Sequence, residues 1–285
     1  STFHKLGLNI ISQVNGIMPK ITQISLRKFV KEQLLLNMQS DTYLNLLILY
    51  LLYNRVVAKS EFEFKTQKEY DEYLKLNPPT TVNNETVKSY GEMDIANFLM
   101  QNGIQYVYEY PYEIDTRTSE YGQYHPDFYL PDYQIYIEYF GINRKGEVPP
   151  YFKATKGISA TEAYRASMEW KRSMHREYKT IMIECYAYEK LEGNLLNSLK
   201  EKLEAASVVL APKSSKELWT QVVAEGNSLL DGIIELFETL INLIKSNGYD
   251  IATVRKLNHA GSNTQTNNTL LSLLEPIFNA YCQYL

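Results

Sequence analysis

Two carboxylates stand where a metal-dependent reaction would need them. Asp127 follows Pro126 at the start of one strand-like run, and Glu138 lies eleven residues later, near the end of the next run. If the two runs form a hairpin, both carboxylates lie on neighbouring strands, where hard oxygen ligands hold Mg²⁺ or Mn²⁺. Glu92, in a preceding helical run, is a candidate third ligand. Such a cation lowers the pKa of its bound water and stabilises charge on a phosphate under attack.

The neighbours of Glu138 help to decide between a metal site and a pair of ordinary solvent-exposed carboxylates. Carboxylates at strand ends are common on solvated faces, so the pair alone is weak evidence for a site. Glu138, however, stands among Ile135, Ile137 and Phe140 in a nearly continuous apolar run. A charge in such a strand is costly unless it is paired or bound to metal, which favours a functional site.

A later helical run carries basic side chains suited to phosphate. Lys171 and His175 are four residues apart and share one helical face, with Arg172 and Arg176 nearby. Arg172, His175 and Arg176 are candidate DNA contacts, and the alternative is an ordinary basic surface helix. His175 is also a candidate general base. Tyr139, next to the second carboxylate, is a candidate for stacking on DNA bases, although tyrosine is also a good strand residue.

Alternating helical and strand patterns position these residues. Asn-Gly at 102–103 ends a helical run, and Pro131-Asp132 provides the turn of a hairpin. The patterns predict an α/β core of one domain. Its expected elements are a helix at 87–101, strands at 104–110, 127–130 and 134–140, a helix at 161–178, a strand at 180–186, a helix at 194–206 and a strand at 208–210.

Helical segments flank this core on both sides. Apolar residues recur at helical spacing over 24–57 and again over 215–285, and a turn-rich stretch at 77–84 separates the first segment from the core. We therefore expect three parts: a helical segment at 1–80, a sheet domain at 81–212 and a second helical segment at 213–285.

Charge is distributed unevenly along the 285 residues. The net charge is −4, so the chain as a whole is not a basic wrapper of nucleic acid. Residues 81–150 carry four basic and eleven acidic side chains, whereas 151–213 carry eleven basic and eight acidic ones. Metal-binding carboxylates in the first segment and phosphate-facing cations in the second would explain this division.

Cysteine content and hydropathy indicate the compartment. The two cysteines, Cys185 and Cys282, form no C-x-x-C pair, so a disulfide scaffold or a thiolate zinc site is not supported and a reducing cytoplasm is expected. The longest apolar stretch, 43–53, is too short for a bilayer, and we expect no membrane association. Because the chain begins without Met, we expect a fragment of a longer protein.

Several motifs resemble a known nuclease family. The order of Glu92, Pro126-Asp127 and Ile-Glu138-Tyr is similar to the PD-(D/E)xK core of the restriction-endonuclease-like fold. More narrowly, residues 85–190 resemble the nuclease module inserted in the 1B region of bacterial UvrD/Rep-like superfamily 1 DNA helicases, including relatives of helicase IV. The matching motifs are VKSYGE at 87–92, IANFL at 95–99, YHPDFYLPDY at 124–133, IYIEYFGI at 135–142 and EWKR at 169–172.

The ends of the chain carry the same resemblance. Residues 2–7 (TFHKLG) look like the helicase segment after motif Ia, and residues 274–285 (LEPIFNAYCQYL) look like the helix ahead of the Walker B motif. The resemblance implies a mixed sheet flanked by helices and inserted between two all-helical segments, with DNA and the ATPase core of the parent helicase as partners. No G-x-x-x-x-G-K-[ST] loop occurs, so ATP hydrolysis is not expected here.

The resemblance also implies roles for individual residues. Asp127 and Glu138 would hold Mg²⁺ or Mn²⁺, Glu92 would complete that site, and the reaction would be DNA phosphodiester hydrolysis in bacterial DNA repair or phage defence. The family places a lysine two residues after the acidic residue, where this chain has Phe140. Either Lys171 takes that position in space, or the module is non-catalytic and guides DNA or docks a partner.

Overall fold

The computed structural model describes residues 3–17, 25–55, 58–118, 122–154, 157–224, 228–258 and 264–284. Thr2 and Leu285, at the outer ends of the two helicase-like motifs, lie outside these ranges. Contacts divide the chain into two compact units, one formed by Ser1–Leu46 with Ser228–Leu285 and the other by Leu47–Asn227. The second, which we call the sheet unit, extends beyond the predicted segment 81–212 at both ends.

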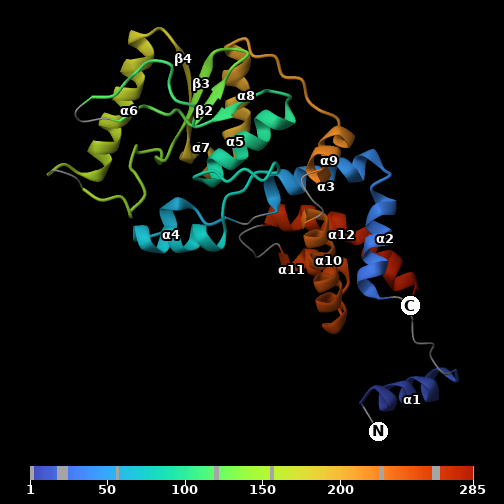
Figure 1. Ribbon diagram of the computed structural model, residues 1–285. Coiled ribbons are helices and arrows are strands. Elements are labelled where there is room, and N and C mark those ends of the chain that lie inside the picture. Colours follow the sequence, from blue (N-terminus) through green and yellow to red (C-terminus); the bar gives the residue numbers. More distant parts are fainter. Residues whose placement is uncertain are drawn as a thin grey trace. The chain divides into compact units, whose positions relative to one another are not determined.

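The sheet unit is a mixed α/β structure around an open four-stranded sheet (Figure 1). The strands are β1 (Val107–Tyr108), β2 (Phe128–Leu130), β3 (Ile135–Phe140) and β4 (Ile181–Tyr186), in the order β1-β2-β3-β4. The first three are antiparallel, and β4 runs parallel to β3. Helix α6 (Ala160–Glu177) makes the crossover between the parallel strands, as a parallel pair requires.

Successive side chains of β3 point to opposite faces of the sheet. Ile135 and Ile137 pack with α5 (Tyr90–Gln101) and α8 (Leu195–Ala205) in the main apolar core. Tyr136 and Phe140 instead pack with residues of α6. Glu138 lies between these two residues in the alternation, so its side chain belongs to the face that α6 covers.

The remaining elements of the sheet unit are short. They are the π-helix η1 (Tyr50–Asn54), the 3₁₀ helix η2 (Glu61–Glu63), α4 (Gln67–Leu76), α7 (Ala187–Leu191) and α9 (Ser215–Ala224). Ser60 and Thr66 cap η2 and α4 through capping boxes, which satisfy backbone N–H groups at both helix starts.

The other unit is helical in its described residues. It contains α1 (Phe3–Asn15), α2 (Leu26–Asn37), α10 (Ser228–Ser246), α11 (Ile251–Asn258) and α12 (Thr264–Tyr284), and α3 (Asp41–Leu49) runs across the division between the units. Helix α2 contacts both α10 and α12, and Leu34, Phe237 and Leu274 are buried side chains of these three helices. None of the helices described here is both long and apolar enough to cross a membrane.

Most of the predicted elements of the core are confirmed, with two corrections. The predicted strand at 104–110 shrinks to Val107–Tyr108, because Glu109 adopts a positive φ of 49° and ends the extended backbone. The predicted strand at 208–210 is wrong. Val208 N bonds to the carbonyl of Leu203 at the end of α8, and Val209 bonds to the hydroxyl of Tyr133, so the segment joins no strand of the sheet.

Candidate active site

The two predicted metal-binding carboxylates lie opposite each other across the β2–β3 hairpin. Phe128 pairs with Ile137 in the register, so Asp127 and Glu138 are the next residues along the two strands. Tyr139 N donates to Asp127 Oδ2 at 2.7 Å, which fixes the Asp127 carboxylate against β3. Glu138 is 1% exposed. The hairpin therefore brings together the acidic pair that the sequence places eleven residues apart.

Lys171 reaches this pair from α6. Its Nζ lies 2.5 Å from Glu138 Oε2 and 5.5 Å from the centroid of the Phe140 ring. Phe140 is itself 1% exposed and packs with Ile142 and Met168. The position two residues after Glu138 is thus part of the apolar packing, while the crossover helix provides an ammonium group on the same face of the sheet.

A hydrogen-bonded chain continues from Glu138 to His175. Tyr124 Oη donates to Glu138 Oε1 at 2.6 Å and lies 3.2 Å from His175 Nε2. His175 Nδ1 lies 2.7 Å from Thr180 Oγ1, which in turn lies 2.6 Å from Tyr112 Oη. Because an ionised carboxylate only accepts, the Tyr124 hydroxyl donates its hydrogen bond to Glu138 and must accept one from His175. The chain therefore fixes His175 with its proton on Nε2.

The burial of His175 differs from the sequence expectation of a phosphate-facing side chain. His175 is 4% exposed, and both ring nitrogens are engaged inside the protein. Burial and the nearby charge of Lys171 lower its pKa to about 4, so the ring is neutral at pH 7. The imidazole accordingly supports Tyr124 and Glu138 and presents no charge to DNA.

Glu92 lies at the start of α5, on the other side of the sheet from α6. Ser89 caps this helix by accepting from Glu92 N at 3.1 Å, and Ser89 Oγ donates to Glu92 Oε1 at 2.9 Å. Tyr108 Oη and Lys88 N donate to Oε2 at 2.5 and 3.1 Å. Burial, and then the charge of Asp127, raises the pKa of Glu92 to about 7. Glu92 is therefore electrostatically coupled to the acidic pair.

Desolvated negative charge dominates the electrostatics of the site. Burial, and then the charge of Glu138, raises the pKa of Asp127 to about 7. Burial also raises the pKa of Glu138, against the opposing effect of Lys171. A divalent cation would relieve this repulsion, and two carboxylates with waters suffice for Mg²⁺, so the donor set fits such an ion. Within the described ranges, no cluster of three or more His, Cys, Asp or Glu residues is arranged as a metal cage.

Tyr139 is buried, whereas the sequence predicts that it faces DNA. It points to the α5 face, as the alternation along β3 requires, and is 8% exposed. A Cβ added to Gly91 of α5 would lie 2.0 Å from the Tyr139 ring, so only glycine permits this approach.

Glu61 is an acidic group near the site that the sequence patterns do not indicate. It lies in η2, and burial, followed by the charge of Glu92, raises its pKa to about 7. A Cβ on Gly141 would lie 3.7 Å from Glu61 Oε2. Because Glu61 is far from the core motifs in sequence and its neighbourhood is of mixed pattern, no spacing rule links it to them.

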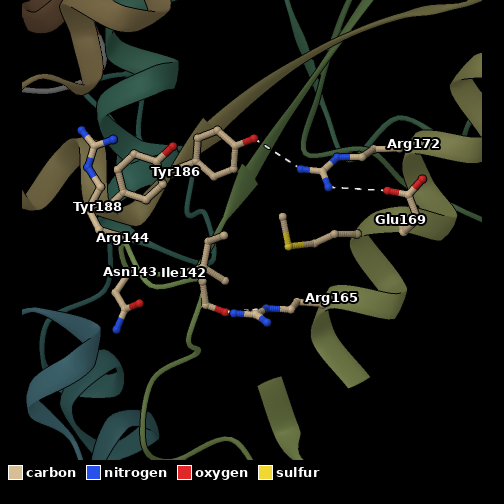
Figure 2. A pocket seen from close by; sticks show the side chains of 10 residues that line it. Ile142, Asn143, Arg144, Arg165, Glu169, Arg172, Tyr186 and Tyr188 are labelled. Carbon is tan, nitrogen blue, oxygen red and sulfur yellow. Dashed lines mark hydrogen bonds and ion pairs between the residues drawn. The ribbon is translucent and has the colours of Figure 1, made fainter. Parts of the chain in front are cut away.

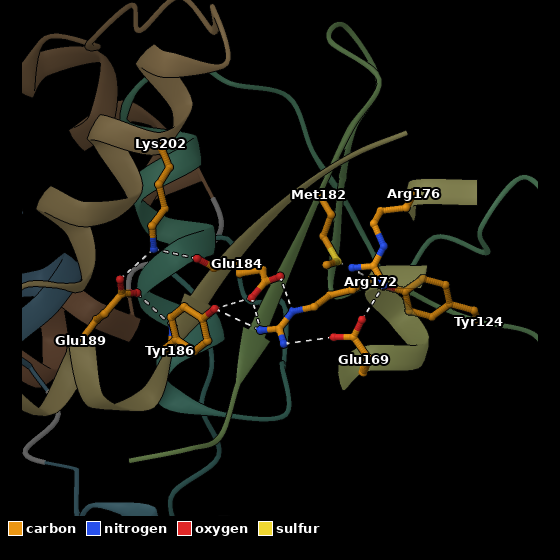
Figure 3. Close-up of polar contacts among 9 residues, drawn as sticks. All are labelled: Tyr124, Glu169, Arg172, Arg176, Met182, Glu184, Tyr186, Glu189 and Lys202. Atoms are coloured by element: carbon orange, nitrogen blue, oxygen red, sulfur yellow. Dashed lines mark hydrogen bonds and ion pairs between the residues drawn. The ribbon is translucent and has the colours of Figure 1, made fainter. Parts of the chain in front are cut away.

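The predicted DNA-contacting arginines border an open pocket at the end of α6. Arg172 makes two hydrogen bonds to Glu184, at 2.8 and 2.6 Å, and Arg176 pairs with Glu169 (Figure 3). The pocket has a volume of about 440 Å³ and is lined by Arg172, His175, Arg176, Lys179, Thr180, Met182 and Glu184. Three cationic side chains and one carboxylate give its rim a positive balance.

All of these residues belong to the sheet unit. The structure pairs Lys171 with Glu138 and brings both within electrostatic reach of Asp127. Glu92 is coupled to Asp127 through charge, and Arg172 and Arg176 line the neighbouring pocket on α6. Comparisons with protein-family models, curated proteins and solved structures gave no match to this chain.

Proposed function

We propose that the sheet unit is a metal-dependent DNA nuclease with a PD-(D/E)xK, restriction-endonuclease-like core. The observation that carries the proposal is the opposition of Asp127 and Glu138 across the hairpin, with Lys171 Nζ 2.5 Å from Glu138 on the same face. Two hard oxygen donors and one ammonium group are the side chains that phosphodiester hydrolysis uses.

Each residue has a distinct part in the proposed chemistry. Bound Mg²⁺ or Mn²⁺ would supply an acidic water and stabilise charge on the phosphate. Asp127, held by Tyr139 N, and Glu138, held by Tyr124, would bind the cation. Lys171 would donate to the phosphate oxygen as negative charge develops there. Arg176 and Lys179, at the rim of the neighbouring pocket, would hold the strand by its backbone.

The helical flanks support a wider context for this proposal. The motifs at both ends of the chain resemble a superfamily 1 helicase, so we assign the nuclease to the 1B region of such an enzyme, with the ATPase core and DNA as partners in the bacterial cytoplasm. DNA repair or phage defence would be the setting. Most of the grip on DNA would then come from that ATPase core.

One observation favours a second candidate, a non-catalytic module that guides DNA or docks a partner. Both carboxylate oxygens of Glu138 already accept hydrogen bonds, one from Tyr124 and one from Lys171. A network closed in this way stabilises the fold without a cation. In an active enzyme, by contrast, the ammonium group would exchange its contact with Glu138 for one with phosphate.

Cleavage of labelled single- and double-stranded DNA in Mg²⁺ or Mn²⁺ separates the two candidates. We expect Asp127→Asn, Glu138→Gln and Lys171→Met to lose cleavage by about 100-fold or more. Asp132→Asn, which neutralises an exposed carboxylate in the hairpin turn, serves as the matched control and retains activity. Absence of cleavage in either metal, together with no Mn²⁺ binding by calorimetry, would favour the non-catalytic module.

A further inference from the structure

A second pocket lies on the other flank of α6, where the loop after β3 meets the start of α7 (Figure 2). Its volume is about 490 Å³, in the range of small-ligand sites. Side chains from three separate segments line it, among them Arg144, Arg165, Met168, Arg172, Tyr186 and Tyr188.

Aromatic rings and a guanidinium group form a stack at one wall of this pocket. The rings of Tyr186 and Tyr188 are nearly parallel, with centroids 4.9 Å apart and planes at 13°. Arg144 Cζ lies 4.3 Å from the centroid of Tyr188, and the Arg144 side chain is 65% exposed. Unpaired bases stack on aromatic rings and on guanidinium planes. Arg144 therefore offers an exposed platform at the end of the stack.

The opposite wall is built by one face of α6. Arg165 and Arg172 are seven residues apart, two helical turns, and extend toward the pocket from the same face. Arg165 Nη2 donates to the Lys145 carbonyl at 2.8 Å and its Nε to that of Gly146 at 3.0 Å, which holds the loop against the helix. Gly146 has φ 72°, and a Cβ there would lie 2.7 Å from Arg165 Nη2.

The charge of the lining is suited to an anion. Three arginines line the pocket with one carboxylate, Glu169, and Arg172 is paired with a second carboxylate, Glu184. Arg165 donates its hydrogen bonds to backbone carbonyls. Arg144 makes two hydrogen bonds to Glu192, at 2.7 and 2.6 Å, and both side chains of this pair are solvent-exposed. The Arg144 guanidinium can therefore exchange this contact for a phosphate group, which it binds through two parallel N–H bonds.

The pocket also adjoins the proposed nuclease site. Arg172 Cζ lies 5.9 Å from the Phe140 centroid, and Lys171 Nζ lies 5.5 Å from the same point. Phe140, which occupies the position where the nuclease family has lysine, thus lies near Lys171 of the proposed nuclease site and near Arg172 of the pocket. A strand whose phosphate reached Lys171 would bring a neighbouring nucleotide to the pocket.

From these contacts we infer that the pocket binds one nucleotide of a single-stranded nucleic acid, with its base on Arg144 and its phosphate among the arginines. The inference rests on the proposed nuclease function, since it assigns the pocket to the strand that the enzyme cuts. Arg144 and Tyr188 would then hold the strand, a role that is separate from the proposed nuclease chemistry.

Fluorescence anisotropy with a labelled oligothymidylate of about 12 nucleotides tests this inference. Binding is measured in EDTA on the Asp127→Asn background, so that no cleavage interferes. We expect Arg144→Ala to raise Kd by about fivefold or more, as for loss of one stacking platform. The control is Arg117→Ala, which also removes an exposed arginine paired with a carboxylate, Asp115, but does not line the pocket. Equal effects of the two substitutions would overturn the inference.

A direct measurement locates the bound base. An oligonucleotide carrying 5-iododeoxyuridine is irradiated in complex with the protein, and we expect the cross-linked peptide to contain Arg144, on which the base stacks, or its pocket-lining neighbours Ile142 and Asn143. Cross-links confined to other peptides would contradict the assignment. If dTMP displaces the oligonucleotide and binds with the same affinity, the pocket is a site for free nucleotides, and the inference that it holds a nucleotide strand is overturned. If the wild-type protein binds the oligonucleotide through Arg144 but cuts no DNA in Mg²⁺ or Mn²⁺, the nuclease proposal fails and the assignment of the pocket stands.

Discussion

Lys171 Nζ and Glu138 Oε2 lie 2.5 Å apart, although 33 residues separate them in sequence. The Glu138 side chain is 1% exposed and that of Lys171 is 23% exposed, so the carboxylate depends on the lysine for compensation. Removing one partner of a buried ion pair leaves an uncompensated charge, which typically costs about 3–5 kcal/mol. We expect Lys171→Met to lower the free energy of unfolding by about 3 kcal/mol at pH 7, measured by urea denaturation.

The double variant Lys171→Met/Glu138→Gln provides the control for that loss. Because both charges are gone, it is expected to recover most of the stability lost in Lys171→Met. If the single and double variants are equally destabilised, the effect comes from lost packing of the lysine stem and the pairing contributes little.

The hydrogen-bonded chain through Tyr124 predicts the state of His175. We expect ¹⁵N-labelled histidine spectra to show the Nε2–H tautomer, neutral down to about pH 5, since burial lowers the pKa to about 4. Tyr124→Phe removes the acceptor of the Nε2 proton and should shift the His175 nitrogens. Tyr129→Phe, whose hydroxyl contacts Glu113 instead, is the matched control. A His175 resonance that titrates near pH 6.5 would contradict the hydrogen bonds of His175 to Tyr124 and Thr180.

The raised carboxyl pKa of Asp127 predicts how stability depends on pH. Its pKa is about 7 in the folded protein and roughly 4 in an unfolded chain. Between these two pKa values the native state holds a proton that the unfolded state releases. The contribution of this proton to the free energy of unfolding is fully present below about pH 4 and is lost as the pH rises through 7. In EDTA, Asp127→Asn should raise Tm by about 2–4 °C at pH 8.

That gain should shrink toward zero as the pH falls to about 4, because the wild-type carboxyl then carries its proton in both states. Asp132→Asn, at an exposed position, is expected to show no such dependence. A Tm difference for Asp127→Asn that is the same at pH 5 and pH 8 would show that Asp127 titrates normally.

The contact between Gly91 and Tyr139 predicts opposite effects of two glycine substitutions. Gly91→Ala would place Cβ 2.0 Å from the Tyr139 ring, so we expect a loss of about 1–3 kcal/mol from overpacking. Gly232 of α10 has no atom within 4 Å of its added Cβ, and Gly232→Ala should stabilise by about 1 kcal/mol through helix propensity. Denaturation followed by circular dichroism distinguishes them, and a neutral Gly91→Ala would falsify the packing of Tyr139.

The hairpin and its carboxylates were predictable because their determinants are local. A turn after Leu130 predicts the hairpin, and the period of two residues places Asp127 and Glu138 on one face of it. The register that sets them opposite each other comes from the four-residue loop 131–134, between the paired residues Leu130 and Ile135. The burial of His175 was not predictable, because α6 has few apolar residues to mark its inward face and the ring is buried through hydrogen bonds with Tyr124 and Thr180.

Two further features depend on tertiary context that no spacing reveals. Val208, Val209 and Leu210 have the composition of a strand, yet Val208 N bonds to the Leu203 carbonyl and Val209 N bonds to the Tyr133 hydroxyl. Glu61 lies near the site because η2 packs near Gly141, and the effect of the Glu92 charge on the pKa of Glu61 follows from that proximity.

The parallel pairing of β3 with β4 also orders events as the chain folds. The β2–β3 hairpin closes across a turn of a few residues, whereas Ile135 and Ile181 pair although they are 46 positions apart in the sequence. Local loops close at lower entropic cost than long ones. We therefore expect the two carboxylates to face each other before α6 docks, and their repulsion to be relieved once Lys171 reaches Glu138. Docking of α6 thereby couples completion of the site to completion of the sheet.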